Sequence, residues 1–199
     1  MNYLPEKREI ILDRELNKLD RFVINFCSLL EKYTKYVIVS GYVSIVLGRS
    51  RATEDVDLLV PRMEFSNFVE MFNNFLNKGY DCINTTNPKE AFEMLDETAI
   101  RFFKQGNPLP NIEFKFIKND LDEYSFENRL KLVLNEGTLF ISPLELQIAY
   151  KLFLSSEKAD KDIEDARHLY KIFQDKINKE TLAIFIRKLN VEKRFKELE

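Results

Sequence analysis

The stretch from Tyr36 to Val60 limits the possible folds of this chain more than any other segment. It predicts a strand, a tight turn at Gly41, a short helix and a second strand that carries Asp55 and Asp57. Since side chains alternate across a strand, residues two positions apart point to the same face. Two carboxylates held close together among apolar neighbours repel each other unless a cation lies between them. The pair could be two solvated acids on an edge strand, but in this setting we favour a pair that binds a divalent metal.

Magnesium suits such a pair because it typically takes one or two protein carboxylates and completes its shell with water and substrate phosphates. Gly41 supports this interpretation, since glycine allows a turn that bulkier residues cannot make. We therefore expect Mg²⁺, or Mn²⁺, as the cofactor, held by Asp55 and Asp57.

These residues resemble the nucleotidyltransferase superfamily that includes DNA polymerase β. The family pattern is a hydrophobic strand, a Gly-Gly or Gly-Ser turn, a spacer, and then R-x-T-x-D-h-D-h, where h is apolar. The chain has the turn at Gly41 and Tyr42, and the second part of the pattern at Arg51, Thr53, Asp55 and Asp57. The resemblance implies an α/β (α+β) fold, a small mixed β-sheet flanked by helices, and nucleotide binding by Gly41, Tyr42, Ser44, Arg51 and Thr53.

Tyr42 departs from the family pattern, which has a small residue at the second position of the turn. A small residue there lets the turn approach the triphosphate. A tyrosine could crowd that approach and leave Ser40 or Ser44 to supply a hydroxyl.

The segment from Asn111 to Ile117 alternates as a strand does, with Ile112, Phe114 and Phe116 on one face and Glu113 and Lys115 on the other. Family members commonly place a third carboxylate on the strand beside the Asp-x-Asp strand, and Glu113 fits that role as a metal ligand that polarises the attacking hydroxyl. An outward-facing Glu and Lys on a half-exposed strand is the alternative, and the sequence leaves both open.

The other elements follow from apolar spacing and from Gly and Pro. The sequence predicts a long first helix from about Glu6 to Lys32 and a second helix from Phe65 to Asn77, after Pro61 ends the preceding strand. It also predicts strands at Tyr80–Ile83 and Thr98–Phe103, a short helix at Pro88–Asp96, a loop at Asn107–Pro110, and a hairpin formed by Lys131–Leu134 and Thr138–Ile141.

From Ser142 onward the pattern is helical, which divides the chain into a core over 1–141 and a helical region over 142–199 that we expect to cover the cleft. Ser142 and Glu145 have the spacing of a capping box. Lys151 lies on the first helix of this region, and the run from Lys158 to Asp165 opens the next.

Lys151 and the run from Lys158 to Asp165 resemble the AbiEii/AbiGii-type branch of the superfamily, whose members include toxins of defence and toxin-antitoxin systems. The resemblance implies that Lys151 contacts the nucleotide phosphates and that Asp162 completes the catalytic site, supported by Lys161 and Asp165. The alternative is that acids in a first helical turn only stabilise the helix. We expect His168 to be a helix-face or core residue.

Composition narrows the possible partners and location. The chain has 199 residues, 45% hydrophobic and 32% charged, with a net charge of −3, which is ordinary for a soluble globular protein and gives no overall attraction for nucleic acid. Cys27 and Cys82 lack metal-site spacing, and no secretory or membrane-spanning run appears, so we expect a cytoplasmic protein with buried thiols and no membrane contact. Basic candidates for an RNA contact are scattered: Arg49, Arg51, Lys104, Lys115 and Lys118.

The expected reaction is metal-dependent transfer of a nucleoside monophosphate from an NTP to a hydroxyl of tRNA or another acceptor, with release of pyrophosphate. The chain could be a toxin with a cognate antitoxin protein. Two alternatives stay open: a catalytically inactive antitoxin or nucleotide-binding partner with this fold, and a small-molecule transferase of the antibiotic-modifying kind.

Overall fold

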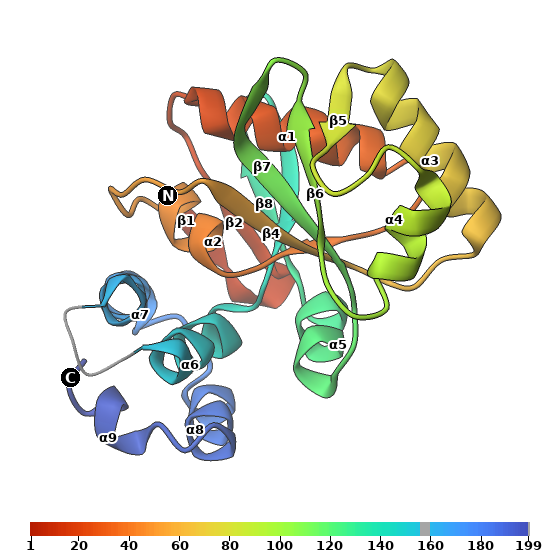
Figure 1. Ribbon diagram of the computed structural model, residues 1–199. Coiled ribbons are helices and arrows are strands. Elements are labelled where there is room, and N and C mark those ends of the chain that lie inside the picture. The colour runs from red at the N-terminus through yellow and green to blue at the C-terminus, as the bar shows by residue number, and fades with distance from the viewer. Residues whose placement is uncertain (156–159, 199) are drawn as a thin grey trace.

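A mixed β-sheet organises the part of the chain that the computed structural model describes, residues 1–155 and 160–198 (Figure 1). Its strand order is β1-β2-β8-β9-β3-β4-β7-β6-β5. The pairs β2–β8, β3–β9 and β4–β7 are parallel and the others antiparallel, which confirms the predicted mixed α/β class. The strands are β1 (Asn2–Leu4), β2 (Glu9–Ile11), β3 (Val37–Ile38), β4 (Asp55–Val60), β5 (Tyr80–Cys82), β6 (Ile100–Lys104), β7 (Asn107–Phe116), β8 (Leu130–Leu134) and β9 (Gly137–Ile141).

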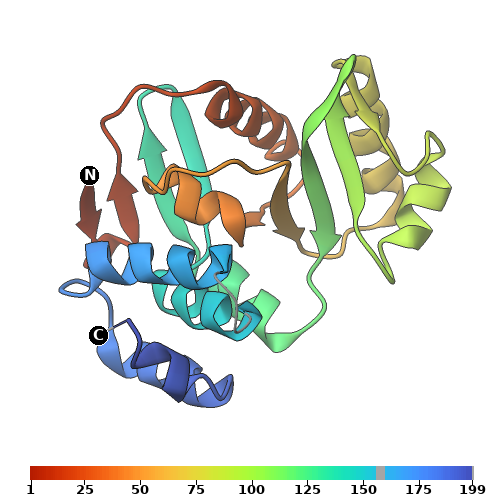
Figure 2. The same cartoon turned by 60° about the vertical axis from the view of Figure 1, so that its left-hand side comes forward.

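Two groups of helices lie apart from each other. Figures 1 and 2 show α6, α7, α8 and α9 gathered together, far from α3 and α4 at the other end of the sheet. The helices are α1 (Lys18–Leu30), α2 (Gly41–Val46), α3 (Phe65–Asn77), α4 (Pro88–Met94), α5 (Asp120–Glu127), α6 (Leu144–Leu154), α7 (Lys161–Phe173), α8 (Lys179–Lys188) and α9 (Glu192–Phe195).

One face of the sheet is covered by an aromatic core. Phe26 of α1 stacks on Phe75 of α3, with ring centroids 4.5 Å apart, and both rings contact Phe102 of β6. Val56 and Leu58 of β4 are fully buried in this core. Because side chains alternate along a strand, the acids of β4 lie on the opposite face of the sheet.

The prediction of a long helix from Glu6 to Lys32 is wrong in its first half. Helix α1 begins only at Lys18, where Asn17 and Asp20 form a reciprocal capping box. Upstream, Ile10 is fully buried in β2, which pairs in parallel with β8. The apolar spacing of this segment fits a helix equally well, and a strand partner some 120 residues away in the chain decides the outcome.

The prediction of a loop at Asn107–Pro110 is also wrong, because this segment is the first part of β7. Here β7 pairs with β6, whereas its pairing with β4 begins only at Asn111. Prolines, which cannot donate to a neighbouring strand, are tolerated where one edge is unpaired. Helix α5 was not predicted. The bounds of α3 are confirmed, each strand of the β8–β9 hairpin begins one residue earlier than predicted, and α4, β5 and β6 agree with prediction within a few residues.

The predicted capping box at Ser142 is absent from the structure. Helix α6 begins at Leu144 without a side-chain cap, and the Ser142 hydroxyl lies 3.3 Å from that of Ser125. Glu145 instead accepts a hydrogen bond from the backbone N–H of Asn178, at 2.7 Å.

The start of the next helix was predicted too early. Asp160 precedes α7 and caps it by accepting from the N–H of Asp162, while Lys158 and Ala159 lie outside the described residues. Cys27 and Cys82 are both buried as free thiols, as predicted. Over the described ranges, no helix combines the length and apolar character needed to cross a membrane.

Candidate active site

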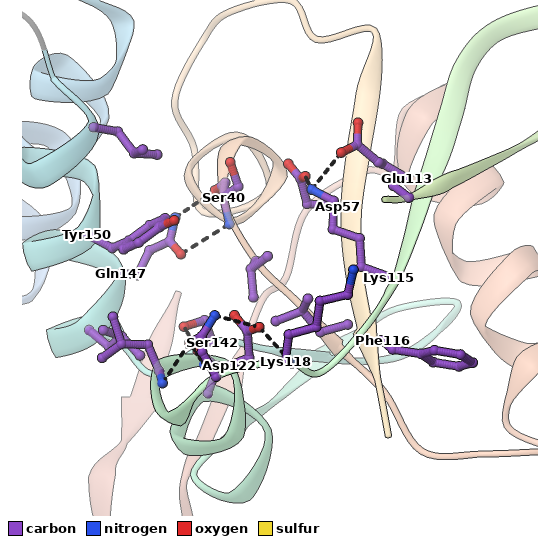
Figure 3. A pocket seen from close by; sticks show the side chains of 18 of the residues that line it. Ser40, Asp57, Glu113, Lys115, Phe116, Lys118, Asp122, Ser142, Gln147 and Tyr150 are labelled. Atoms are coloured by element: carbon purple, nitrogen blue, oxygen red, sulfur yellow. Dashed lines mark hydrogen bonds and ion pairs between the residues drawn. The ribbon is translucent and has the colours of Figure 1, made fainter. Parts of the chain in front are cut away.

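Two acidic side chains face each other on neighbouring strands of the open sheet face. Strands β4 and β7 are parallel, and their register pairs Asp57 with Glu113. The ammonium of Lys115 lies between them, 2.7 Å from Asp57 Oδ1 and 2.6 Å from Glu113 Oε1 (Figure 3). Arg101 of β6 donates to the other Glu113 oxygen at 2.8 Å. The predicted position of Glu113 beside the Asp-x-Asp strand is thus confirmed, and Lys115, which the sequence suggested only as a candidate for an RNA contact, lies between the two acids.

The charges of this cluster stabilise one another. Burial alone would lower the pKa of Lys115, but Asp57 and Glu113 outweigh it and the pKa is raised. Burial would likewise raise the pKa of Glu113, whereas the contacts with Lys115 and Arg101 lower it. The Glu113 carboxylate and the Lys115 ammonium are therefore both held in their charged forms.

Asp57 and Glu113 are ligands of the type that a hard divalent cation prefers. Asp57 and Glu113 offer carboxylate oxygens to one shared position, and a positive group already lies there. In the described residues no group of three or more acidic, His or Cys side chains is arranged to hold a metal ion. Lys115 would have to leave the space between the two carboxylates for a metal to take it.

Asp55 lies two residues upstream on the same face of β4 and is partly buried. The hydroxyl of Thr53 donates to the Asp55 carbonyl at 2.9 Å and approaches its carboxylate Oδ1 at 3.3 Å. Thr53 thus holds the start of β4, which places the Asp55 carboxylate on the face that carries Asp57.

The turn between β3 and α2 has an unusual backbone. Ser40 adopts φ 62° and ψ −134°, a conformation that is normally restricted to glycine and costs about 1–3 kcal/mol in other residues. Gln147 of α6 holds this residue with both ends of its amide: its oxygen accepts from Ser40 N–H at 3.2 Å, and its nitrogen donates to Ser40 C=O at 2.6 Å. Nothing in the local sequence pattern signals this contact between residues 107 positions apart.

Gly41 follows, and a guanidinium lies against it. A side-chain carbon added to Gly41 would lie 2.5 Å from Nη2 of Arg51, so a larger residue would require the Arg51 side chain to shift. Gly41 and Arg51, both predicted to bind nucleotide, are therefore neighbours in space.

Tyr42 and Ser44 point away from the cleft. The Tyr42 side chain is fully buried, and its hydroxyl donates to Asp20 Oδ1 at 2.9 Å. Burial raises the pKa of this phenol further above its ordinary value, and Asp20 adds to the effect. Ser44 is also fully buried. The Tyr42 ring therefore does not crowd the turn, and neither side chain is placed to contact a nucleotide.

Lys151, Asp162 and Asp165 come together as predicted, but in a buried ionic network. Lys151 is only 2% exposed; its ammonium pairs with Asp162 and lies 3.1 Å from Asp165. Asp165, which is fully buried, also accepts two hydrogen bonds from Arg51, at 3.0 and 2.8 Å. The network joins α6 and α7 to the segment before β4, and its carboxylates already balance the charge of Lys151.

His168 lies beside this network on α7. Its Nε2 is 3.2 Å from the carbonyl oxygen of Leu47, at the end of α2. This contact agrees with the predicted helix-face role.

A cavity of about 470 Å³ opens between the acids and the helical region. Figure 3 shows Asp57, Glu113 and Lys115 on one side of it and Ser40, Gln147 and Tyr150 on the other. Tyr150 and Leu154 of α6 line the cavity and are partly exposed. Its remaining lining includes Glu97, Phe116, Lys118, Asn119, Asp122, Ser125, Ser142 and Leu146. The cleft thus joins a charged end to an apolar wall.

Neither a protein-family model nor a curated protein sequence matches this chain. Solved structures do match it. An antigenic nucleotidyltransferase-like protein from Paracoccidioides brasiliensis aligns with a TM-score of 0.54 at 15% identity, over 89% of each chain. The antibiotic-resistance factor ANT(2'')-Ia aligns with a TM-score of 0.53 at 12% identity, over 89% of this chain and 93% of that chain. At these identities the likeness concerns the fold, and the chain has the fold of nucleotidyltransferase-like proteins.

Proposed function

We propose that the chain transfers a nucleoside monophosphate from an NTP to a hydroxyl acceptor, with Mg²⁺ or Mn²⁺ as cofactor. The observation that carries the proposal is the pairing of Asp57 with Glu113 around one cation position, at the mouth of a cleft beside the turn at Ser40. The likeness of the fold to nucleotidyltransferase-like proteins supports it.

Each group then has a part in the reaction. Asp57 and Glu113, with Asp55 beside them, would hold the metal, which supplies positive charge to the reacting phosphates when it is bound. The turn at Gly41 would receive the triphosphate. The acceptor oxygen attacks the α-phosphorus, the bond from that phosphorus to the bridging oxygen breaks, and pyrophosphate leaves. Glu113, which lines the cleft, would take the proton of the attacking hydroxyl.

Lys151 and Asp162 have a narrower part in this proposal than the family resemblance implies. Lys151 could reach a phosphate only by leaving Asp162 and Asp165, and it does not line the cleft. We propose that the network chiefly holds Arg51 beside Gly41. The only support for a toxin role with a cognate antitoxin is the sequence motif around Lys151 and Asp162.

Transfer can be tested with purified protein, Mg²⁺ and each labelled NTP in turn. Total tRNA is the acceptor in one set of reactions and a panel of aminoglycosides in another. Asp57→Asn should abolish labelling, whereas Asp81→Asn, the same exchange on β5 outside the cleft lining, should leave it unchanged. Equal labelling by wild type and Asp57→Asn would refute the proposed site. NTP binding without any labelling would favour the inactive nucleotide-binding partner.

A small hydroxyl compound is the acceptor that the structure favours over tRNA. The cleft has the volume of a small-molecule site and includes the apolar wall of Tyr150 and Leu154. Four of the five basic side chains that the sequence suggests as candidates for an RNA contact have partners within the chain. Arg49 and Arg51 pair with Asp165, Lys115 lies between two acids, and Lys104 donates to a backbone carbonyl.

A further inference from the structure

We infer that Gln147 is a positioning residue for the nucleotide: it holds the strained turn at Ser40 in the conformation that receives the triphosphate. The inference rests on the proposed function and deepens it, because it makes the conformation of the turn depend on helix α6.

The turn needs an outside support. Ser40 is a non-glycine residue at φ 62° and ψ −134°, where the side-chain carbon is crowded by the backbone. Such a conformation persists only where surrounding contacts fix it, and these positions gather at ligand sites. Ser40 also lines the cleft that contains Asp57.

Gln147 provides that support. Its amide both accepts from the N–H and donates to the C=O of the same residue, which fixes the orientation of the peptide units on both sides of Ser40 (Figure 3). The Gln147 side chain is buried, with 3% of the residue exposed, so water competes poorly for these two bonds.

A second contact from the same helix reaches the next residue of the turn. Lys151, one helical turn after Gln147, pairs with Asp165, which in turn holds Arg51 against Gly41. Helix α6 therefore holds Ser40 directly and is linked by an ionic chain to Arg51, which lies beside Gly41. The helical region is thus part of the nucleotide site and not only a cover over it.

The test measures the affinity of each of the four NTPs with Mg²⁺, and the KM and kcat of transfer. Gln147→Met keeps the shape of the side chain and removes both hydrogen bonds. We expect at least a tenfold weaker NTP affinity and a matching rise in KM, with a smaller change in kcat. Gln174→Met, on the exposed surface after α7, is the matched control and should behave as wild type.

Rescue separates positioning from packing. Glycine adopts the conformation of Ser40 without crowding, so Ser40→Gly should restore at least a third of the affinity lost in Gln147→Met, with Ser40→Gly alone measured as the reference for any effect of losing the serine hydroxyl. Wild-type affinity in Gln147→Met would overturn the inference. A loss that Ser40→Gly does not relieve would also overturn it, because it would assign Gln147 to packing alone.

A stability measurement keeps the inference testable if the proposed function fails. If wild type binds none of the four NTPs, the proposed function is refuted, and the four combinations of the two substitutions can still be compared by urea unfolding. Ser40→Gly should stabilise Gln147→Met more than it stabilises wild type. Equal effects in both backgrounds would show that Gln147 does not hold the strained residue.

Discussion

Asp57 and Glu113 lie directly opposite each other on parallel strands and share the ammonium of Lys115. Two carboxylates in register on one sheet face repel each other, and the lysine supplies the charge that offsets the repulsion. A divalent metal would offer the same positive charge to the same oxygens. Lys115 and the metal should therefore compete for this position.

The first prediction follows from that competition. Lys115→Met should bind Mn²⁺ at least about tenfold more tightly than wild type, about 1.4 kcal/mol, because the two carboxylates lose their internal cation. Electron paramagnetic resonance of Mn²⁺ measures the free ion directly. Lys118→Met removes a charge from the same cleft but not from between the carboxylates, so it serves as the control. Weaker Mn²⁺ binding by Lys115→Met, or an equal gain in both variants, would contradict the competition.

The second prediction concerns the buried network. Asp165 is fully buried and contacts Arg51, Lys151 and Arg49. Asp165→Ala should lower the free energy of unfolding by about 3–5 kcal/mol, because buried cations are left without their carboxylate. Asp162→Ala, three residues earlier on α7 and more exposed, should cost clearly less. Urea unfolding checks both variants, and equal losses would show that Asp165 does not anchor the network.

Local spacing predicted the elements that hold the site. The strand, turn, helix and strand around Gly41 are confirmed, as are α3 and the β8–β9 hairpin. Each depends on residues close together in the chain, such as an apolar run, a glycine or a proline. The β2 strand at Ile10 depends on pairing with β8, which is distant in sequence, and the prediction failed there. It also failed at the prolines of β7, because these are tolerated only where one edge of the strand is unpaired.

The same distinction applies to the candidate site. Strand alternation predicted that Asp55 and Asp57 share one face of their strand and that Glu113 and Lys115 share one face of theirs. The parallel register of β4 and β7 puts these two faces side by side on the same face of the sheet. The alternation could have identified Lys115 as a site residue, because it lies two positions from Glu113. Gln147 carries no such signal, since its role depends on how α6 packs against Ser40.

The third prediction concerns Tyr42, whose ring occupies the core and not the turn. Tyr42→Phe should lower the free energy of unfolding by about 1 kcal/mol through loss of its hydrogen bond to Asp20, and leave NTP affinity unchanged. Tyr42→Ser, which restores the small residue of the family pattern, should be far less stable because it empties a fully buried site. Thermal unfolding and NTP titration distinguish these effects. Weaker NTP binding by Tyr42→Phe would place the ring in the nucleotide site.

The fourth prediction concerns pH and Asp20. Burial alone would raise the pKa of this carboxyl, but hydrogen bonds from Arg14, the backbone of Asn17 and the Tyr42 hydroxyl outweigh it and lower the pKa. A carboxyl whose folded pKa is depressed stabilises the fold fully above its unfolded pKa of about 3.9. That contribution is lost as the pH falls through the lower, folded pKa. Urea unfolding at pH 7 should therefore show Asp20→Asn less stable than wild type, and the gap should narrow below about pH 4. A gap that stays constant down to pH 3 would show that the charge of Asp20 does not contribute to stability.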